Sequence, residues 1–232
     1  MSKLNVVGTL NEPLSEDYQH VYSFSCQNAL DDYEYVESLN QETTFDNDTK
    51  LLIVGTLTPP KGKEKYFYST TSNSIYGLID EALNNGGKLE NLKGQFKDYN
   101  DSCSNKNEVD SDNKVVRDKI KEYLKDNKIA FLDVVKYAIR NKYSSSDEDI
   151  VVAELDYDEF KDLENVKKII VNSRAAEDAL KKIFNKNFGD PEIYNEKVIY
   201  LSQNRRGLSR ERWAELKEKW LEEIRNTLNI QS

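Results

Sequence analysis

The sequence predicts an α/β protein, a three-layer α/β/α sandwich around a central four-stranded, mostly parallel sheet. Four short apolar segments rich in Ile, Val and Leu alternate along the chain with stretches of helical spacing. Such β-α-β alternation favours a parallel sheet with helices on its faces. The four segments are almost continuously apolar, which is typical of strands buried on both faces.

The predicted strands are Leu51–Gly55, Ile129–Val134, Lys168–Asn172 and Lys197–Ser202. The predicted helices are Asn73–Leu83, Lys114–Asn127, Tyr157–Leu163, Ala175–Phe184 and Arg210–Leu228. The last helix carries one apolar stripe formed by Trp213, Leu216, Trp220 and Ile224. We expect both tryptophans to pack this helix on the sheet rather than to contact a ligand. Two polar stretches are predicted to be exposed loops, Asn100–Asn113 and Asn141–Asp149.

Composition narrows the class of protein. A chain of 232 residues with 38% hydrophobic and 32% charged residues is typical of a soluble globular protein. No apolar run approaches the roughly 18–20 residues that span a bilayer, and no signal peptide is evident. Cys26, Cys103 and the single histidine, His20, lack metal-ligand spacing, so we expect neither a metal nor a cofactor. Two separated cysteines favour a cytoplasmic protein with reduced thiols.

The net charge of −9 is unevenly distributed. Residues 1–50 contain ten acidic residues and two lysines, which leaves the rest of the chain nearly neutral. We therefore predict an acidic N-terminal extension over 1–48 and one α/β domain over 49–232. The extension could be a solvated segment, an arm that binds a protein partner, or a repulsive gate, and the first is favoured. The domain could still bind nucleic acid through a local basic groove.

The stretch from Leu51 to Tyr76 is the most informative. Its strand ends at Gly55, and a Pro-Pro turn, three aromatic residues and Asn73 follow. Open α/β sheets bind ligands at the carboxyl ends of their strands. Aromatic rings near a side-chain amide suit stacking on a planar base and hydrogen bonding to it. Composition alone favours a simpler alternative, in which the aromatics are core and Asn73 is a helix N-cap.

These segments resemble the uracil-DNA glycosylase superfamily, and most closely its hypoxanthine-DNA glycosylase branch. The resemblance rests on Gly55–Pro60, Phe67-Tyr68, Thr70–Asn73, Phe131–Lys136 and Lys168–Ala176, and it extends from residue 49 to the C-terminus. The chain departs from the family at two places. Thr70-Thr71 stands where the branch has His-Pro, and Leu201–Gly207 replaces a Ser-Pro or His-Pro loop that presses on the DNA backbone.

The resemblance implies roles for specific residues. The catalytic pair would be Asn73, which orients water or binds the base, and Asp133, which accepts a base N–H and stabilises the sugar cation. The base-binding residues would be Gly55, Thr56, Phe67, Tyr68 and Asn172. The residues at the DNA backbone would be Ser202, Asn204, Arg205 and Arg206.

Structural alternatives stay open for several of these residues. Asp133 could cap the turn after its strand, and Asn172 could cap the next helix, which is the favoured role for Asn172. Of the aromatic pair, Tyr68 is favoured for the pocket and Phe67 for the core. The arginines after the fourth strand could pair with nearby acids instead of phosphates.

The leading functional prediction is a monomeric DNA base glycosylase that needs no metal or cofactor. It would hydrolyse the N-glycosidic bond of a flipped uracil or hypoxanthine in DNA repair, and its partner would be DNA containing the deaminated base. One alternative is a catalytically degenerate relative that binds nucleic acid or a protein partner. Another is an enzyme that acts on free nucleosides or nucleotides.

Overall fold

The computed structural model describes residues 33–57, 66–69, 73–97, 106–141, 150–202 and 207–230. The strands are β1 (Tyr33–Glu37), β2 (Leu51–Gly55), β3 (Ile129–Asp133), β4 (Val135–Asn141), β5 (Ile150–Leu155), β6 (Lys168–Val171) and β7 (Val198–Tyr200). The helices are the 3-10 turn η2 (Asn40–Glu42), α3 (Ile75–Ala82), α4 (Lys88–Lys93), α5 (Lys106–Asp126), α6 (Arg174–Phe188), α7 (Pro191–Lys197) and α8 (Arg210–Leu228).

The central sheet confirms the predicted α/β fold. Its four strands lie in the order β3-β2-β6-β7, and every neighbouring pair is parallel. They coincide with the four predicted strands, although three of them end slightly earlier than predicted. The register pairs Gly55 with Asp133 and Val54 with Val171, so the carboxyl ends of β3, β2 and β6 lie side by side.

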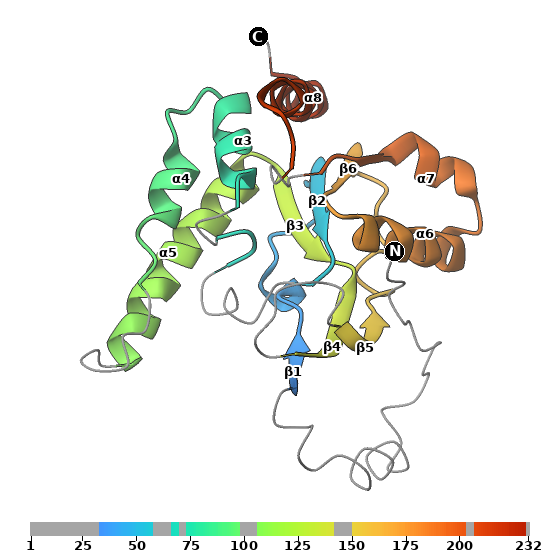
Figure 1. The fold of residues 1–232 in the computed structure, drawn as a ribbon, viewed down its shortest axis with the longest axis horizontal. Coiled ribbons are helices and arrows are strands. Elements are labelled where there is room, and N and C mark those ends of the chain that lie inside the picture. The colour runs from blue at the N-terminus through green and yellow to red at the C-terminus, as the bar shows by residue number, and fades with distance from the viewer. Residues whose placement is uncertain are drawn as a thin grey trace, which may run out of the picture.

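Helices cover both faces of this sheet (Figure 1). Leu51 and Ile53 of β2 belong to a buried cluster with α3, α5 and α8. Leu52 and Val54 point to the opposite face and pack in a second cluster with α6. Successive side chains of a strand point to opposite faces, so a continuously apolar strand fills two cores at once.

A second, antiparallel sheet was not predicted. Its strand order is β1-β4-β5, and β4 begins directly after β3. The apolar side chains of Val36, Ala138 and Ala153 join the core cluster that contains α6. Residues 33–37 of the predicted extension are thus paired with the domain through β4, whereas residues 1–32 lie outside the described part.

Two local predictions were wrong. Tyr157–Leu163 forms turns rather than a helix, and its apolar spacing reflects the burial of Phe160 and Leu163 under the second sheet. The predicted loop Asn100–Asn113 is helical from Lys106 onward. Asn113 is buried there and its amide bonds to both backbone groups of Lys97, so a polar residue acts as a packing contact.

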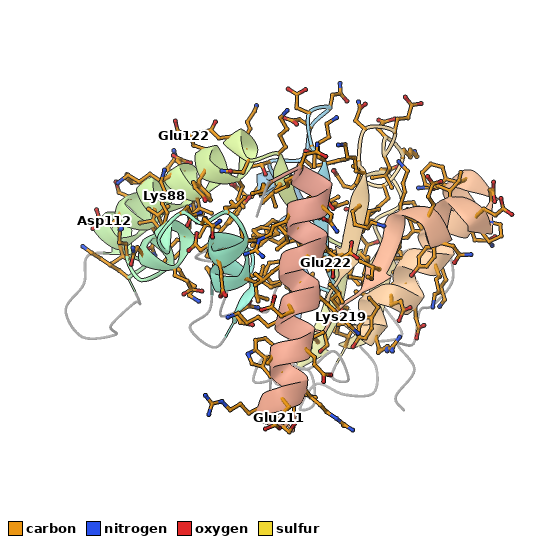
Figure 2. All side chains as sticks on the ribbon, turned by 90° about the horizontal axis from the view of Figure 1, so that it is seen from above. Lys88, Asp112, Glu122, Glu211, Lys219 and Glu222 are labelled. Carbon is orange, nitrogen blue, oxygen red and sulfur yellow. The ribbon has the colours of Figure 1, made fainter. Side chains whose placement is uncertain are left out.

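Helix α8 has the predicted bounds and runs across the sheet (Figure 2). Trp220 and Ile224 are fully buried on the sheet side, which confirms the predicted packing for these two residues. The indole N–H of Trp220 donates to the carbonyl of Ser202 at 3.2 Å. Trp213 is only half-buried. No helix in the described ranges is both long enough and apolar enough to cross a membrane.

Truncation of Trp220 should therefore be far more costly than truncation of Trp213 on the same helix. We expect Trp220→Ala to lower the free energy of unfolding by about 3–5 kcal/mol, because it leaves a large cavity and an unpaired carbonyl. Trp213→Ala is the matched control, with a clearly smaller loss. Urea unfolding followed by circular dichroism measures both, and equal losses would contradict the packing described for α8.

Candidate functional site

The carboxyl edge of the central sheet gathers the polar residues that the sequence pointed to. Gly55 ends β2, its register partner Asp133 ends β3, and Asn172 follows β6 on the other side. Asp133 and Asn172 are only 2% and 6% exposed. Asp and Asn side chains are mostly exposed in proteins, and open α/β sheets bind their ligands at this edge.

Two side chains, those of Tyr68 and Asp133, meet at Gly55. A Cβ added to Gly55 would lie 2.6 Å from the hydroxyl of Tyr68 and 3.3 Å from Oδ1 of Asp133. The glycine is therefore required by the close approach of Tyr68, since any side chain would collide with this hydroxyl. The phenol and the carboxylate share one small space above the strand end.

Tyr68 reaches this position through an unusual backbone conformation. Its φ of 55° lies in the left-handed region, which side-chain-bearing residues rarely adopt. Its half-buried ring packs edge-to-face on Phe131 of β3, with centroids 5.0 Å apart. Backbone strain of this kind persists where the surroundings impose it, often at functional sites.

Contacts on both sides of Tyr68 hold it in place. The hydroxyl of Ser69 accepts from the N–H of Tyr66 at 3.0 Å and donates to its carbonyl at 2.6 Å. The hydroxyl of Tyr76, in α3, donates to the carbonyl of Phe67 at 2.7 Å. Burial raises the pKa of Tyr76 well above its usual value, so this phenol stays a neutral donor.

Two predicted base-binding residues have supporting positions. Phe67 is fully buried in the core, and its ring contacts Tyr66, Tyr68 and Phe131. Its ring is enclosed by protein, so it has no open face for stacking. The hydroxyl of Thr56 lies 2.8 Å from that of Ser173, which joins the ends of β2 and β6.

Asn73 lies two residues before α3, whose N-cap is Ser74. Its Oδ1 accepts the backbone N–H of Ile75 at 2.9 Å, and its carbonyl accepts from Lys93 at 2.9 Å. The side chain is half-buried. An amide oxygen can accept two hydrogen bonds, so the bond to Ile75 leaves one acceptor position and the NH₂ group for other contacts.

Asn172 does not cap the following helix, contrary to the favoured prediction. Ser173 takes that role, because its hydroxyl accepts the N–H of Ala176 at 3.1 Å. The Nδ2 of Asn172 is buried and has no hydrogen-bond partner among the described residues. A buried donor without a partner costs about 1–3 kcal/mol, and a ligand that accepts a hydrogen bond from it would remove this cost.

The loop after β7 begins at the same edge. The N–H of Leu201 donates to the carbonyl of Val171, so the following Ser202 lies near Asn172. Ser202 is half-buried, and its carbonyl accepts from Trp220. The other three residues predicted to contact DNA, Asn204, Arg205 and Arg206, lie outside the described residues, as do Thr70 and Thr71.

Asn40 is a member of the site that sequence reasoning missed. Its side chain accepts from the N–H of Asp133 at 2.8 Å and donates to the carbonyl of Asp133 at 2.9 Å. Its Nδ2 also donates to Oδ2 of Asp156 at 2.9 Å. Asn40 is only 4% exposed. In the sequence it is one polar residue within the acidic stretch predicted to be an extension, so no local pattern indicated its burial.

The threonines after Asn40 continue this contact along β3. The hydroxyl of Thr43 donates to the carbonyl of Phe131 at 2.6 Å, and that of Thr44 donates to the carbonyl of Ile129 at 3.1 Å. Strand β3 is an edge strand, and its outer carbonyls are thus satisfied by side chains instead of another strand. Residues 40–44 therefore fix the strand that carries Asp133.

The functional groups at the site are a carboxylate, a side-chain amide, a phenol and an aromatic wall. Within the described parts of the chain, no group of three histidine, cysteine, aspartate or glutamate side chains is arranged to hold a metal ion.

Comparison with known proteins identifies the fold. No family model and no curated protein matches this sequence. The solution NMR structure of a putative uracil DNA glycosylase from Methanosarcina acetivorans is similar, with a TM-score of 0.51 and 20% sequence identity. The match covers 80% of this chain and 94% of that chain. This chain therefore has the fold of that protein over most of its length.

The contact between Gly55 and Tyr68 predicts a strong coupling between the two positions. Gly55→Ala should displace the Tyr68 ring and lower both stability and ligand binding, because the new methyl group overlaps the hydroxyl. Tyr68→Phe removes that hydroxyl, and the next ring atom is at an ordinary contact distance of 3.5 Å. We expect the double variant to recover most of the stability that Gly55→Ala loses, as measured by a double-mutant cycle in urea. Additive losses would contradict this geometry.

Removal of the Asn40 side chain should destabilise the end of β3. Asn40→Ala leaves the N–H and carbonyl of Asp133 unpaired in a buried place, and we expect a loss of about 2–3 kcal/mol in the free energy of unfolding. Gln41→Ala, at an exposed neighbouring position, is the control. Chemical denaturation distinguishes the two, and similar losses would show that the Asn40 contacts do not hold the strand.

Proposed function

We propose that this protein is a DNA base glycosylase that hydrolyses the N-glycosidic bond of a flipped uracil or hypoxanthine. The observation that carries the proposal is the convergence of Tyr68, Asp133 and Asn172 at one edge of the sheet. The fold supports it, because the similar structure from Methanosarcina acetivorans is named a putative uracil DNA glycosylase. A flipped base needs a pocket with an aromatic surface and polar groups at its edge.

The two polar side chains match the edge of a deaminated base. Uracil and hypoxanthine each present an N–H next to a carbonyl oxygen. The carboxylate of Asp133 can accept the N–H, and the unpaired Nδ2 of Asn172 can donate to the carbonyl. They end the two strands on either side of β2, so they would approach the base from two sides. Cytosine and adenine carry an amino group in place of that carbonyl, which leaves the Asn172 donor without an acceptor.

The remaining residues would supply binding and water. Tyr68 would stack against or border the base, a contact worth about 1–3 kcal/mol in related systems. The negative charge of Asp133 would stabilise the positive charge that develops on the sugar. Asn73 would orient the attacking water through the hydrogen-bonding positions that its contact with Ile75 leaves open. Ser202, Asn204, Arg205 and Arg206 would contact phosphates on the DNA backbone.

A second candidate function is nucleic-acid binding without base release. It is favoured by the contact of Asn73, whose Oδ1 is already engaged by the N–H of Ile75, and by Thr70-Thr71 in place of His-Pro. Such a protein would keep the aromatic and polar pocket but lack the group that activates water. A protein partner for the acidic N-terminal residues belongs to this candidate.

Base release from defined oligonucleotides tests the catalytic proposal. Single- and double-stranded oligonucleotides containing deoxyuridine or deoxyinosine are incubated with the protein, and abasic sites are revealed by alkaline cleavage. We expect cleavage with at least one of these bases and a rate about 100-fold lower for Asp133→Asn, which removes the charge but keeps the shape. Asn172→Ala should lower the rate of base release about tenfold, mainly through weaker substrate binding, because one hydrogen bond to the base is lost. Asp162→Asn, at an exposed site, is the control.

Several outcomes separate the candidates. No abasic site on any substrate at high protein concentration would overturn the glycosylase proposal. Salt-dependent DNA binding without base release, weakened by Arg205→Ala with Arg206→Ala, would establish the second candidate. Turnover of free nucleosides or nucleotides, but not of oligonucleotides, would show that the same pocket serves small substrates.

A further inference from the structure

A pocket of about 600 Å³ lies at the amino ends of the central strands, opposite the candidate base site. Lys50 precedes β2, Lys128 precedes β3 and Lys167 stands just before β6, and all three line the pocket. Lys88, the first residue of α4, lines it as well. Its volume is within the range of small-molecule sites, about 300–1,000 Å³.

The sheet register brings three of these lysines together. The N–H of Lys50 donates to the carbonyl of Lys128 at 2.9 Å, and the N–H of Lys167 donates to the carbonyl of Lys50 at the same distance. The three residues are therefore adjacent across neighbouring strands, in the order Lys128, Lys50, Lys167. Like charges in neighbouring positions of a sheet repel and lower stability.

The described part of the chain offers these lysines no ion-pair partner. Among the described residues, none of the four lysines has a carboxylate within ion-pair distance, although nearby Lys125 and Lys217 do pair, with Asp46 and Glu81. The chain has 42 acidic and 33 basic residues, so acids are in excess. Only one residue that lines the pocket, Asp126, is acidic. The pocket is thus a local cationic site in an acidic protein.

The other walls suit an organic ligand. Leu83, Leu228 and Ile230 contribute apolar surface, and Tyr123 contributes its ring. The buried Nδ2 of Asn85 has no hydrogen-bond partner among the described residues, and its residue lines the pocket. Burial and the charge of Asp80 raise the pKa of Tyr123 to about 12, so this phenol is neutral at physiological pH.

We propose that this pocket binds a small molecule carrying at least two phosphate charges. Lysine ammonium groups bind phosphate as point charges, and a convergent set of them suits a multiply charged group. The apolar walls and the amide of Asn85 would contact the organic part of the ligand. None of the residues that line this pocket belongs to the candidate base site of Tyr68, Asp133 and Asn172, so the proposal is independent of the proposed glycosylase activity.

Calorimetric titration at low ionic strength tests this proposal, with ADP, inorganic pyrophosphate and adenosine as probes. We expect ADP and pyrophosphate to bind and adenosine not to bind. Lys50→Gln with Lys128→Gln should weaken ADP binding about tenfold or more, because two of the four charges are removed. The matched control, Lys182→Gln with Lys219→Gln, removes two exposed lysines of α6 and α8 and should change binding less than twofold; Lys219 is labelled in Figure 2.

Thermal unfolding gives a second readout that does not depend on heat of binding. Removal of two like charges should leave the free protein equally or more stable, whereas ADP should raise the melting temperature of the wild type but not of the Lys50 and Lys128 variant. Equal binding of adenosine and ADP would overturn the proposal. An equal loss of ADP affinity in the two double variants would overturn it as well. So would a Lys50 and Lys128 variant that binds ADP normally and is impaired only in binding duplex DNA. None of these results depends on whether the protein releases bases from DNA.

Discussion

The hydrogen bonds of Asn40 hold the place where the two sheets and the candidate site meet. One side chain satisfies both backbone groups of Asp133 and also binds the carboxylate of Asp156. Asp133 ends β3 just before the chain enters β4, and Asp156 follows β5 and donates its N–H to Val134. A single buried amide thus joins the parallel sheet to the antiparallel one. The position of the Asp133 carboxylate beside Gly55 depends on this junction.

The two edges of the central sheet have opposite chemistry. The carboxyl edge holds a carboxylate, an amide and a phenol within a largely buried site, and the amino edge holds four lysines around an open pocket. The parallel arrangement causes this separation, because all the carboxyl ends of the strands lie at one edge of the sheet and all the amino ends at the other. This topology therefore places the carboxylate of the candidate base site and the lysines of the pocket at opposite ends of the strands. The negative net charge of the whole chain does not indicate the lysine pocket, because it sums over all residues.

The fold and the side chains of the candidate site support the proposed function separately. The fold is shared with a solved structure at 20% identity, and at so low an identity the role of each side chain is inferred from its own contacts. Tyr68 and Asn172 support a base pocket, one through its strained backbone and the other through its unpaired amide. Asn73 is the residue on which the two candidate functions divide. Its hydrogen bond to the N–H of Ile75 is compatible with both, so only base release distinguishes them.

Local patterns determined the four central strands, helix α8 and the strand-end positions of Gly55 and Asp133, because continuous apolar runs and helical spacing are properties of neighbouring residues. The tertiary structure decided the rest. The contact of Asn40 with Asp133 joins residues 93 positions apart, and the lysine row arises from the register of three strands. Nor could the sequence tell whether Asn172 or Ser173 caps α6, since either residue type makes a good cap. Such pairings depend on which distant groups the folded chain brings within a few ångströms, and no local pattern encodes that distance.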